Sequence, residues 1–386
     1  MGSSSWNQVI SGFDSPHILQ TSQWAEVKKH AGWKPHFLVW HLVNNKLALN
    51  VSKVNTFENL KPAAAALVLE RQVVPGLAVM YLPKGPLLID WKDQGLREQI
   101  IIDLEAYAQR AKVIQMKIDP DLELGRGVPG EEGSSENPVG KLFLDELDQR
   151  GWLFSPDQIQ FRNTVLVDLR EDEDQILAGM KSKTRYNIRL SARKGITVRE
   201  GDEKDLADLY QMYAATSVRG DFTIRSQAYY QTLWQTFIKR GSLPESEPFA
   251  QPMIAEYEGR PVAGAVIFQF KDRAWYLHGM SLPEHSDKMA PHLIQWEALR
   301  WAKSQGCTVY DMWGAPDTFD ESDSMWGVYR FKSGYGGEVI RTIGAWDYPS
   351  RPFFYRLFTR WVPRVLNIMR WFGNQRTRRI STEDPR

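Results

Sequence analysis

The sequence predicts an α/β protein made of two similar domains in tandem. Predicted strands and helices alternate along most of its 386 residues, a length at which two domains are expected. A short pattern also recurs, as Tyr81-Leu82 followed by Gly85 and as Tyr276-Leu277 followed by Gly279. In both halves a predicted helix comes next, and then a strand that closes near an aspartate and a proline. A diverged duplication of one α/β domain explains this order.

In the first half, hydrophobic periodicity and turn residues define most elements. Gln20–His30 is a short amphipathic helix with Thr21 or Ser22 as its N-cap. A hairpin around Asn44-Asn45 follows. The other predictions are strands at Phe37–Val43, Lys46–Lys53, Ala78–Leu82 and Val113–Ile118, helices at Gln94–Ala111 and Val139–Arg150, and a polar, glycine-rich loop at Leu124–Pro138.

The second half repeats the alternation and ends in an aromatic segment. Met325–Glu338 is predicted as a strand and a glycine-rich turn, with Lys332 packed among aromatic residues. The preceding predictions are strands at Thr164–Asp168, Ala274–Leu277 (ending at His278-Gly279) and Thr308–Met312, a hairpin of Met253–Glu258 and Arg260–Phe270 around Gly259, and helices over most of Asp172–Arg193, Asp202–Val218, Ser226–Lys239 and Pro291–Ser304. We place the first domain at 6–158, completed by about 340–365, the second at 159–339, and a basic tail at 366–386.

Composition excludes several classes of protein. The net charge of +1 gives no global attraction to nucleic acid, and one cysteine allows neither an intrachain disulfide nor a cysteine-rich zinc site. The N-terminus lacks the features of a signal peptide, and no apolar run approaches the roughly 18–20 residues of a membrane span. Metal-binding, P-loop, GxGxxG and GxSxG motifs are missing. We therefore expect a cytoplasmic protein with no metal and no cofactor.

The C-terminal segment is basic and apolar. Arg351–Arg386 contains nine arginines against Glu383 and Asp384, together with several aromatic and aliphatic residues. This pattern predicts a basic amphipathic helix. Such a helix can lie on an anionic membrane, here the inner face of the cell membrane, or dock on the body of the protein, and the two are not exclusive.

Two sets of basic residues are candidates for chemistry. Lys332, beside Phe331 and ahead of flexible backbone, can hold a positive charge against a developing anion; the alternative is a lysine that reaches to solvent from a strand. A second set falls within fourteen residues and contains no acid. It suits phosphate or RNA contact as well as a solvated helix face. Its members are Lys181, Lys183, Arg185, Arg189, Arg193 and Lys194.

Taken together, several motifs resemble the Fem family of peptidoglycan-bridge aminoacyltransferases. The match runs through most of the chain, and the number and order of the matching segments make it specific. The matching pieces are Trp24-Ala25-Glu26-Val27-Lys28 with Gly32-Trp33, Tyr81-Leu82-Pro83-Lys84-Gly85-Pro86, Lys181–Ile188, Trp275-Tyr276, Tyr310-Asp311 and Tyr329-Arg330-Phe331-Lys332. The resemblance implies tandem GNAT-like acyltransferase domains. Ser191–Gly241 is too short for the coiled-coil arm of some members, so the compact form is expected.

The resemblance also implies a reaction and its partners. An aminoacyl group passes from aminoacyl-tRNA to the side-chain amine of a peptidoglycan stem peptide, carried on lipid II or on UDP-MurNAc-pentapeptide, in cross-bridge formation. A monomer suits the compact form.

Residue roles follow by position from the same resemblance. Lys28 and Arg225 are expected to hold the phosphates of the acceptor, while Trp33, Tyr229 and Tyr276 bind the acceptor in its cleft. Phe331 and Lys332 are expected at the point of acyl transfer. The family often has a tyrosine where this chain has His278, which puts the choice of acceptor in question rather than the reaction.

The implied chemistry needs no metal because the aminoacyl ester is already activated. Lys332 would stabilise the oxyanion, and Phe331 would shape the pocket for the terminal adenosine or the aminoacyl group. The amine would lose its proton to Asp119, to Asp311 or to the substrate itself, although both aspartates suit loop or capping roles equally well. The basic residues from Lys181 to Arg193 would contact the tRNA.

Two other functions fit the sequence less fully. One is a GNAT-type N-acyltransferase that uses acyl-CoA on a polysaccharide or lipid, which ribonuclease would not inhibit. The other is a non-enzymatic protein that binds RNA or membrane through its basic segments, which would keep its binding function without Lys332.

Overall fold

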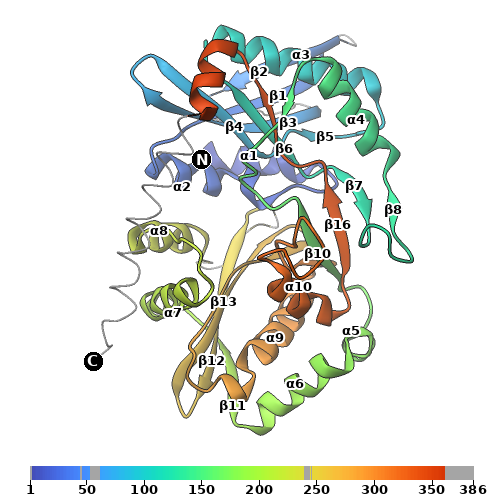
Figure 1. Cartoon of the computed structure of the whole chain (residues 1–386). Helices are drawn as coiled ribbons and strands as arrows, with labels where there is room; N and C mark the ends of the chain where they lie inside the picture. The colour runs from blue at the N-terminus through green and yellow to red at the C-terminus, as the bar shows by residue number, and fades with distance from the viewer. Residues whose placement is uncertain (1, 44–45, 53–60, 239–243, 245, 361–386) are drawn as a thin grey trace.

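The computed structural model describes residues 2–43, 46–52, 61–238, 244 and 246–360, and the side chains from Trp6 onward. Two β-sheets lie one above the other in Figure 1, each flanked by helices. The upper sheet, here the first sheet, comes mainly from the first half of the chain. The lower one, the second sheet, comes mainly from the second half.

The first sheet has the strand order β2-β1-β3-β4-β6-β17-β9, with β5 paired to β3. Its pairing confirms the predicted hairpin on either side of residues 44–45. The chain returns to this sheet near its end, because the late strand β17 pairs with both β6 and β9. The strands are β1 Lys34–Val43, β2 Lys46–Ser52, β3 Pro62–Val74, β4 Leu77–Lys84, β5 Leu87–Leu88, β6 Met116–Pro120, β9 Leu153–Phe154 and β17 Trp346–Tyr348.

The second sheet has the order β11-β12-β13-β14-β15-β10-β16-β7-β8. Two predictions here were wrong. The predicted loop Leu124–Pro138 contains the hairpin of β7 and β8, because β16 offers its edge to β7. The strand predicted to end at His278-Gly279 runs on to Ser281, since β13 pairs with it along that length through a bulge. The strands are β7 Glu123–Arg126, β8 Ser135–Glu136, β10 Asn163–Asp168, β11 Ile196–Glu200, β12 Phe249–Tyr257, β13 Arg260–Phe270, β14 Arg273–Ser281, β15 Val309–Asp311 and β16 Glu338–Thr342.

Each sheet contains one parallel pair joined by a helix. Strand β4 runs through α3 (Gln94–Arg110) to β6, and β14 runs through α9 (Ala290–Ser304) to β15. Asp119 lies on β6 and Asp311 on β15, each beside the strand that carries the recurring tyrosine. The two halves therefore share one strand–helix–strand unit, as the recurring pattern predicted.

Most predicted helices are present with shifted ends. The side chain of Thr21 accepts a hydrogen bond from the backbone of Trp24, which confirms the predicted N-cap of α2. The long helical prediction at 172–193 divides into two helices around Lys181. The other helices are α1 Gly2–Ser11, α2 Ser22–His30, α4 Pro138–Gln149, α5 Glu173–Gly179, α6 Ser182–Arg193, α7 Leu206–Arg219, α8 Gln227–Phe237 and α10 Trp326–Lys332.

The aromatic segment before the glycine-rich turn is a helix, α10, and not the predicted strand. Trp326 and Tyr329 pack at the i,i+3 spacing of a helix, with ring centroids 5.5 Å apart. A 3₁₀ turn follows, in which Gly334 approaches α6 so closely that a Cβ would collide with Thr184. Gly336 then adopts a left-handed backbone with φ of 77°. The glycines thus seat the end of α10 against the start of α6.

Three apolar cores hold the molecule together. One lies between the first sheet and helices α3 and α4, and another between the second sheet and helices α5, α6 and α9. The third joins α1, α2 and the opposite face of the first sheet to α7, α8 and β13. Because this third core draws on both halves of the chain, it fixes the two sheets relative to each other.

The described part of the C-terminal basic segment is a helix at residues 352–360. The rest of that prediction, including the tail at 366–386, lies outside the described residues. Among the residues that the structure does describe, no helix has both the length and the apolar character needed to cross a membrane.

Candidate functional site

A group of three basic side chains, here the cation cluster, lies where α2, β3 and the start of α8 meet. Lys28 on α2 directs its Nζ to within 3.0 Å of the hydroxyl of Tyr229. The guanidinium of Arg225 lies 4.8 Å from the centre of the Tyr229 ring. Arg71 on β3 lies 5.6 Å from the ring of Trp33. The three cations therefore gather on a framework of aromatic rings.

Among the described residues, none of the three cations forms an ion pair with a carboxylate. Burial, together with the positive charges of Arg225 and Arg71, lowers the pKa of Lys28 to about 7. A site in which cations repel one another gains most from a bound anion, and a phosphate or diphosphate offers charge and several acceptor oxygens.

Four of the predicted acceptor-binding residues meet here: Lys28, Trp33, Arg225 and Tyr229. The sequence analysis missed Arg71, because a single arginine near the end of a strand has no local pattern that marks it. Strand β3 is antiparallel to β1, which brings its end beside the start of β1 and hence beside Trp33.

Lys332, at the end of α10, is a further basic residue of the candidate site. Its side chain is buried and donates hydrogen bonds to the carbonyl oxygens of Trp313 and, at 2.8 Å, Gly314. Burial lowers its pKa to about 7, an effect that the carboxylate of Asp311 opposes. Of the three N–H groups of the ammonium, these two carbonyl oxygens accept from two.

Phe331 borders a cavity of about 200 Å³ at the start of α9. Its ring centroid lies 5.0 Å from that of His292 and 5.3 Å from that of Tyr335. Burial and the nearby Lys183 lower the pKa of His292 to about 4, so this histidine is neutral at physiological pH. Phe331 and Lys332 therefore face two sides of one helix end, one toward a cavity and one toward the Trp313-Gly314 turn.

A chain of paired charges, here the buried ion network, links the two sheets. Arg273 on β14 bonds to Asp311 at 2.6 Å and to Asp121 at 2.9 Å. Lys84, at the end of β4, lies 3.7 Å from Asp121 and 3.8 Å from Asp119. Each cation has two carboxylates within 4 Å, so every charge in the network has a partner of opposite sign, unlike those of the cation cluster.

The two predicted proton acceptors differ within this network. Asp311 is saturated, since it also accepts from the backbone N–H of Trp313 at 2.8 Å and from the hydroxyl of Thr164. Burial raises the pKa of Asp119 to about 6, against the lowering effects of Lys84 and of the hydrogen bond from Tyr81. Asp119 is thus the better placed of the two to exchange a proton near neutral pH.

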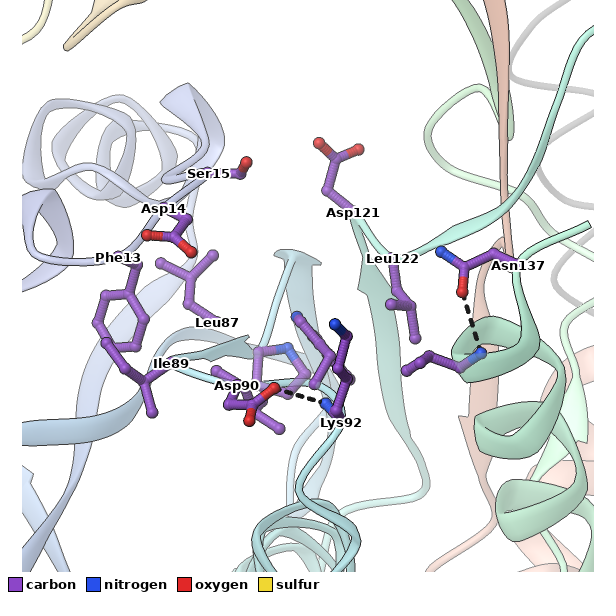
Figure 2. Close-up of a pocket in the computed structure, with 14 residues that line it drawn as sticks. Phe13, Asp14, Ser15, Leu87, Ile89, Asp90, Lys92, Asp121, Leu122 and Asn137 are labelled. Carbon is purple, nitrogen blue, oxygen red and sulfur yellow. Dashed lines mark hydrogen bonds between the residues drawn. The ribbon is translucent and has the colours of Figure 1, made fainter.

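Figure 2 shows a cavity of about 490 Å³ beside the same network. Asp121 extends toward it from the end of β6, and Asp14 lies on the opposite wall. Although burial alone would raise it, Arg273 and Lys84 hold the pKa of Asp121 below its ordinary range. Asp90 and Lys92 also line the cavity, so its wall carries charges of both signs.

Tyr276 and His278 both lie on β14, a strand that carries none of the three cations of the cluster. Tyr276 packs in the core of the second sheet, where burial raises its pKa to about 12. His278 is buried among aromatic residues and accepts a hydrogen bond from the indole of Trp234 at 3.3 Å. Burial lowers its pKa to about 3, so it is a neutral core residue.

Helix α6 divides the predicted phosphate-contacting residues into two kinds. Arg185 bonds to the carbonyl oxygens of Ala178 and Met180 and so closes the end of α5. Lys181 donates to Ser333 at 3.1 Å, beside Lys332. Lys183, Arg189 and Arg193 are exposed. The helix thus starts near the candidate transfer point and carries exposed charge away from it.

Sequence comparison decides the family. A model of the FemAB family matches residues 7–247 and 239–361. The chain belongs to the FemAB family. The predicted resemblance is thereby confirmed over nearly the whole chain.

Curated relatives in this family include two lipid II:glycine glycyltransferases. The protein from Staphylococcus haemolyticus (strain JCSC1435) is 22% identical over 423 residues, covering 93% of this chain and 95% of its own length. The protein from Staphylococcus aureus (strain USA300) is 22% identical over 422 residues with the same coverage.

Solved structures confirm the fold class. The crystal structure of FemX matches with a TM-score of 0.74 and 18% identity, covering 92% of this chain and 98% of that one. A tandem GNAT protein from the clavulanic acid biosynthesis pathway matches with a TM-score of 0.50 and 11% identity, covering 90% and 94%. The fold is therefore α/β with tandem GNAT-like units, and from Ser191 to Ile238 it forms β11, α7 and α8 without a long arm.

Proposed function

We propose that this FemAB-family chain is an aminoacyltransferase that acts in cross-bridge formation. It takes an aminoacyl group from aminoacyl-tRNA and attaches it to the side-chain amine of a peptidoglycan stem peptide. The carrier of that peptide is lipid II or UDP-MurNAc-pentapeptide. The names of the FemAB-family relatives support the reaction and lipid II as the carrier.

The observation that carries the proposal is the cation cluster. Both candidate carriers have a diphosphate, and Lys28, Arg71 and Arg225 offer three charges that pair with no carboxylate among the described residues. Tyr229 can donate to the same oxygens once an anion draws Lys28 away. An acyltransferase whose acceptor had no phosphate would gain nothing from this arrangement.

The chemistry assigned to the transfer point is aminolysis of an ester. The acceptor amine forms a bond to the carbonyl carbon, and the bond from that carbon to the ribose oxygen of the tRNA breaks. Lys332 donates its free N–H to the oxyanion, and Phe331 forms a wall of the donor pocket. Asp119 takes the amine proton, and the ribose oxygen leaves with a proton from solvent.

The experiment that tests this function is a transfer assay. Purified protein is mixed with pooled radiolabelled aminoacyl-tRNAs and with the acceptor in its lipid II and UDP-linked forms, with and without ribonuclease. Label on an acceptor that disappears with ribonuclease is the expected result. Transfer that resists ribonuclease and depends on acyl-CoA would contradict the proposed donor.

A further inference from the structure

The end of the first sheet nearest the cation cluster carries exposed apolar side chains. Val73 and Val74, at the end of β3, are 42% and 49% exposed. Phe353 and Leu357, on helix 352–360, are 73% and 47% exposed. Large apolar side chains exposed in one place on a protein mark a contact surface.

These two segments lie at the same end of the sheet. Val74 pairs with Leu77 at the start of β4. Ile114 donates to the carbonyl of Ala78, and Arg351, just before the helix, donates to the carbonyl of Ile114. Three strand spacings, about 14 Å, therefore separate β3 from the start of the helix. We call residues 71–77 and 351–360 the basic apolar rim.

The helix is held with its apolar side chains outward. Tyr355 is buried, and its hydroxyl donates to Asp347 at 3.2 Å, which fixes the inner face. Phe353 and Leu357 are four residues apart and so share another face of the helix. Their exposure is thus set by a buried contact on the body of the protein.

The charge of the rim is entirely positive. It contains Arg71, Arg351, Arg356 and Arg360, and no aspartate or glutamate. Arg110 and Lys112, exposed at the end of α3, add to it, because the neighbouring Gln109 bonds to Tyr348 at the end of β17. Apolar side chains interleaved with arginines match the interface of an anionic bilayer, where rings enter the acyl boundary and guanidinium groups meet phosphates.

We infer that the basic apolar rim is the surface on which this protein docks to an anionic lipid bilayer. Arg71 belongs both to the rim and to the cation cluster, so docking places the cluster at the height of the lipid phosphates. A lipid-linked diphosphate would then reach Lys28 and Arg225 without leaving the membrane. The inference rests on the proposed function only in taking the lipid-linked acceptor as the substrate.

Vesicle binding by the full-length protein tests the inference. Wild type should co-sediment with vesicles of phosphatidylglycerol and phosphatidylcholine and much less with phosphatidylcholine alone. Phe353→Ser with Leu357→Ser should weaken the partition at least about tenfold, since two apolar side chains no longer enter the bilayer. The matched control is Leu142→Ser with Ile102→Ser, two exposed apolar residues on α4 and α3, which should bind like wild type. A melting curve confirms that each variant is folded.

Activity adds a second readout. The Phe353→Ser/Leu357→Ser variant should transfer to the soluble UDP-linked acceptor at the wild-type rate and lose most of its transfer to lipid II in vesicles. Arg356→Gln with Arg360→Gln, which leaves the apolar residues in place, should weaken binding mainly at low salt.

Three results would overturn the inference. The first is that wild type fails to bind phosphatidylglycerol vesicles, and the second is that the serine variant binds them as well as wild type does. Alternatively, wild type would form a dimer that the serine variant breaks, and the rim would then be an interface between two copies. If neither acceptor is used, the proposed function fails, while the vesicle measurement still decides the docking surface by itself.

Discussion

The cation cluster and the buried ion network use the same kinds of side chain in opposite ways. In the network, Lys84 and Arg273 each lie within 4 Å of two carboxylates, so the charges satisfy one another. In the cluster, Lys28, Arg71 and Arg225 face one another with aromatic rings between them. The paired charges are buried at the junction of the sheets, whereas Arg71 and Arg225 of the cluster are exposed, and we propose that the cluster binds an anion. Lys332 belongs with the second kind, because its hydrogen-bond partners are carbonyl oxygens.

The largest effect should come from breaking the network. Arg273→Met leaves Asp121 and Asp311 buried without their partner, and we expect the free energy of unfolding to fall by about 3–5 kcal/mol. Chemical denaturation measures this change. Arg260→Met, at an exposed position on β13 in the same sheet, is the control and should change stability by less than about 0.5 kcal/mol. Equal stability of the two variants would show that the network is not structural.

Lys332→Met should affect activity and not stability. We expect kcat to fall by about 10²–10³, the usual effect of removing one oxyanion donor. Unfolding should be unchanged or harder, because a buried charge without a carboxylate partner is removed. Single-turnover transfer measures the activity, and a melting curve measures the stability. Arg330→Met, exposed on the same helix, is the control. Full activity of Lys332→Met would exclude the assigned oxyanion role.

Removing one cation of the cluster should weaken acceptor binding. Arg71→Met, Lys28→Met or Arg225→Met should each raise KM for the acceptor roughly tenfold to a hundredfold with little change in kcat, because a charged hydrogen bond to phosphate is lost. None should lower stability, since each removes a repulsion. Steady-state kinetics with the UDP-linked acceptor measures the effect, with the exposed Lys29→Met as control. A drop in kcat at constant KM would place these residues elsewhere in the reaction.

The cluster should also make acceptor binding depend on pH. The pKa of Lys28 is about 7 in the free protein, and its charged form is the protonated one. Affinity for the UDP-linked acceptor, measured without tRNA so that no chemistry occurs, should therefore weaken as pH rises through about 7. Lys28→Arg keeps its charge and should remove this dependence. If both proteins bind equally well from pH 6 to 9, the charge of Lys28 does not contribute.

The smallest effect is expected on α6. Arg189→Gln with Arg193→Gln should lower affinity for tRNA a few-fold and reduce the slope of log affinity against log salt by about 1–2, as two phosphate contacts are lost. Lys194→Gln is the control, because Lys194 is paired with Asp287 at 2.8 Å. Filter binding across a salt series measures this. An unchanged slope of log affinity against log salt would show that these arginines do not contact tRNA phosphates.

Hydrophobic periodicity and turn residues predicted those helices and hairpins whose formation depends on nearby residues in the sequence. Helices α3, α4 and α9 and the hairpins of β1–β2 and β12–β13 follow from periodicity and turn residues. The β7–β8 hairpin was missed because its polar, glycine-rich residues become strands only beside β16. Helix α10 was predicted as a strand because its aromatic residues favour strands, while packing against Phe319 and α6 decides the outcome.

The residues of the candidate site also differ in whether the sequence alone could predict them. Lys28, Arg225, Tyr229, Phe331 and Lys332 were predicted from the family resemblance. The partners Arg71, Lys84, Asp121 and Arg273 were not, since each is one charge on a strand or strand end and only the pairing of strands brings it to its place. Sequence also left Asp119 and Asp311 equivalent, and the hydrogen bonds around Asp311 separate them.

The central claim is that unpaired cations mark the substrate. Its most direct test compares transfer to UDP-MurNAc-pentapeptide with transfer to the same muramyl pentapeptide lacking the diphosphate. For wild type we predict that kcat/KM falls about a hundredfold or more without the diphosphate, and that Lys28→Met/Arg225→Met treats the two acceptors nearly alike. Equal kcat/KM of wild type on both acceptors would contradict the account.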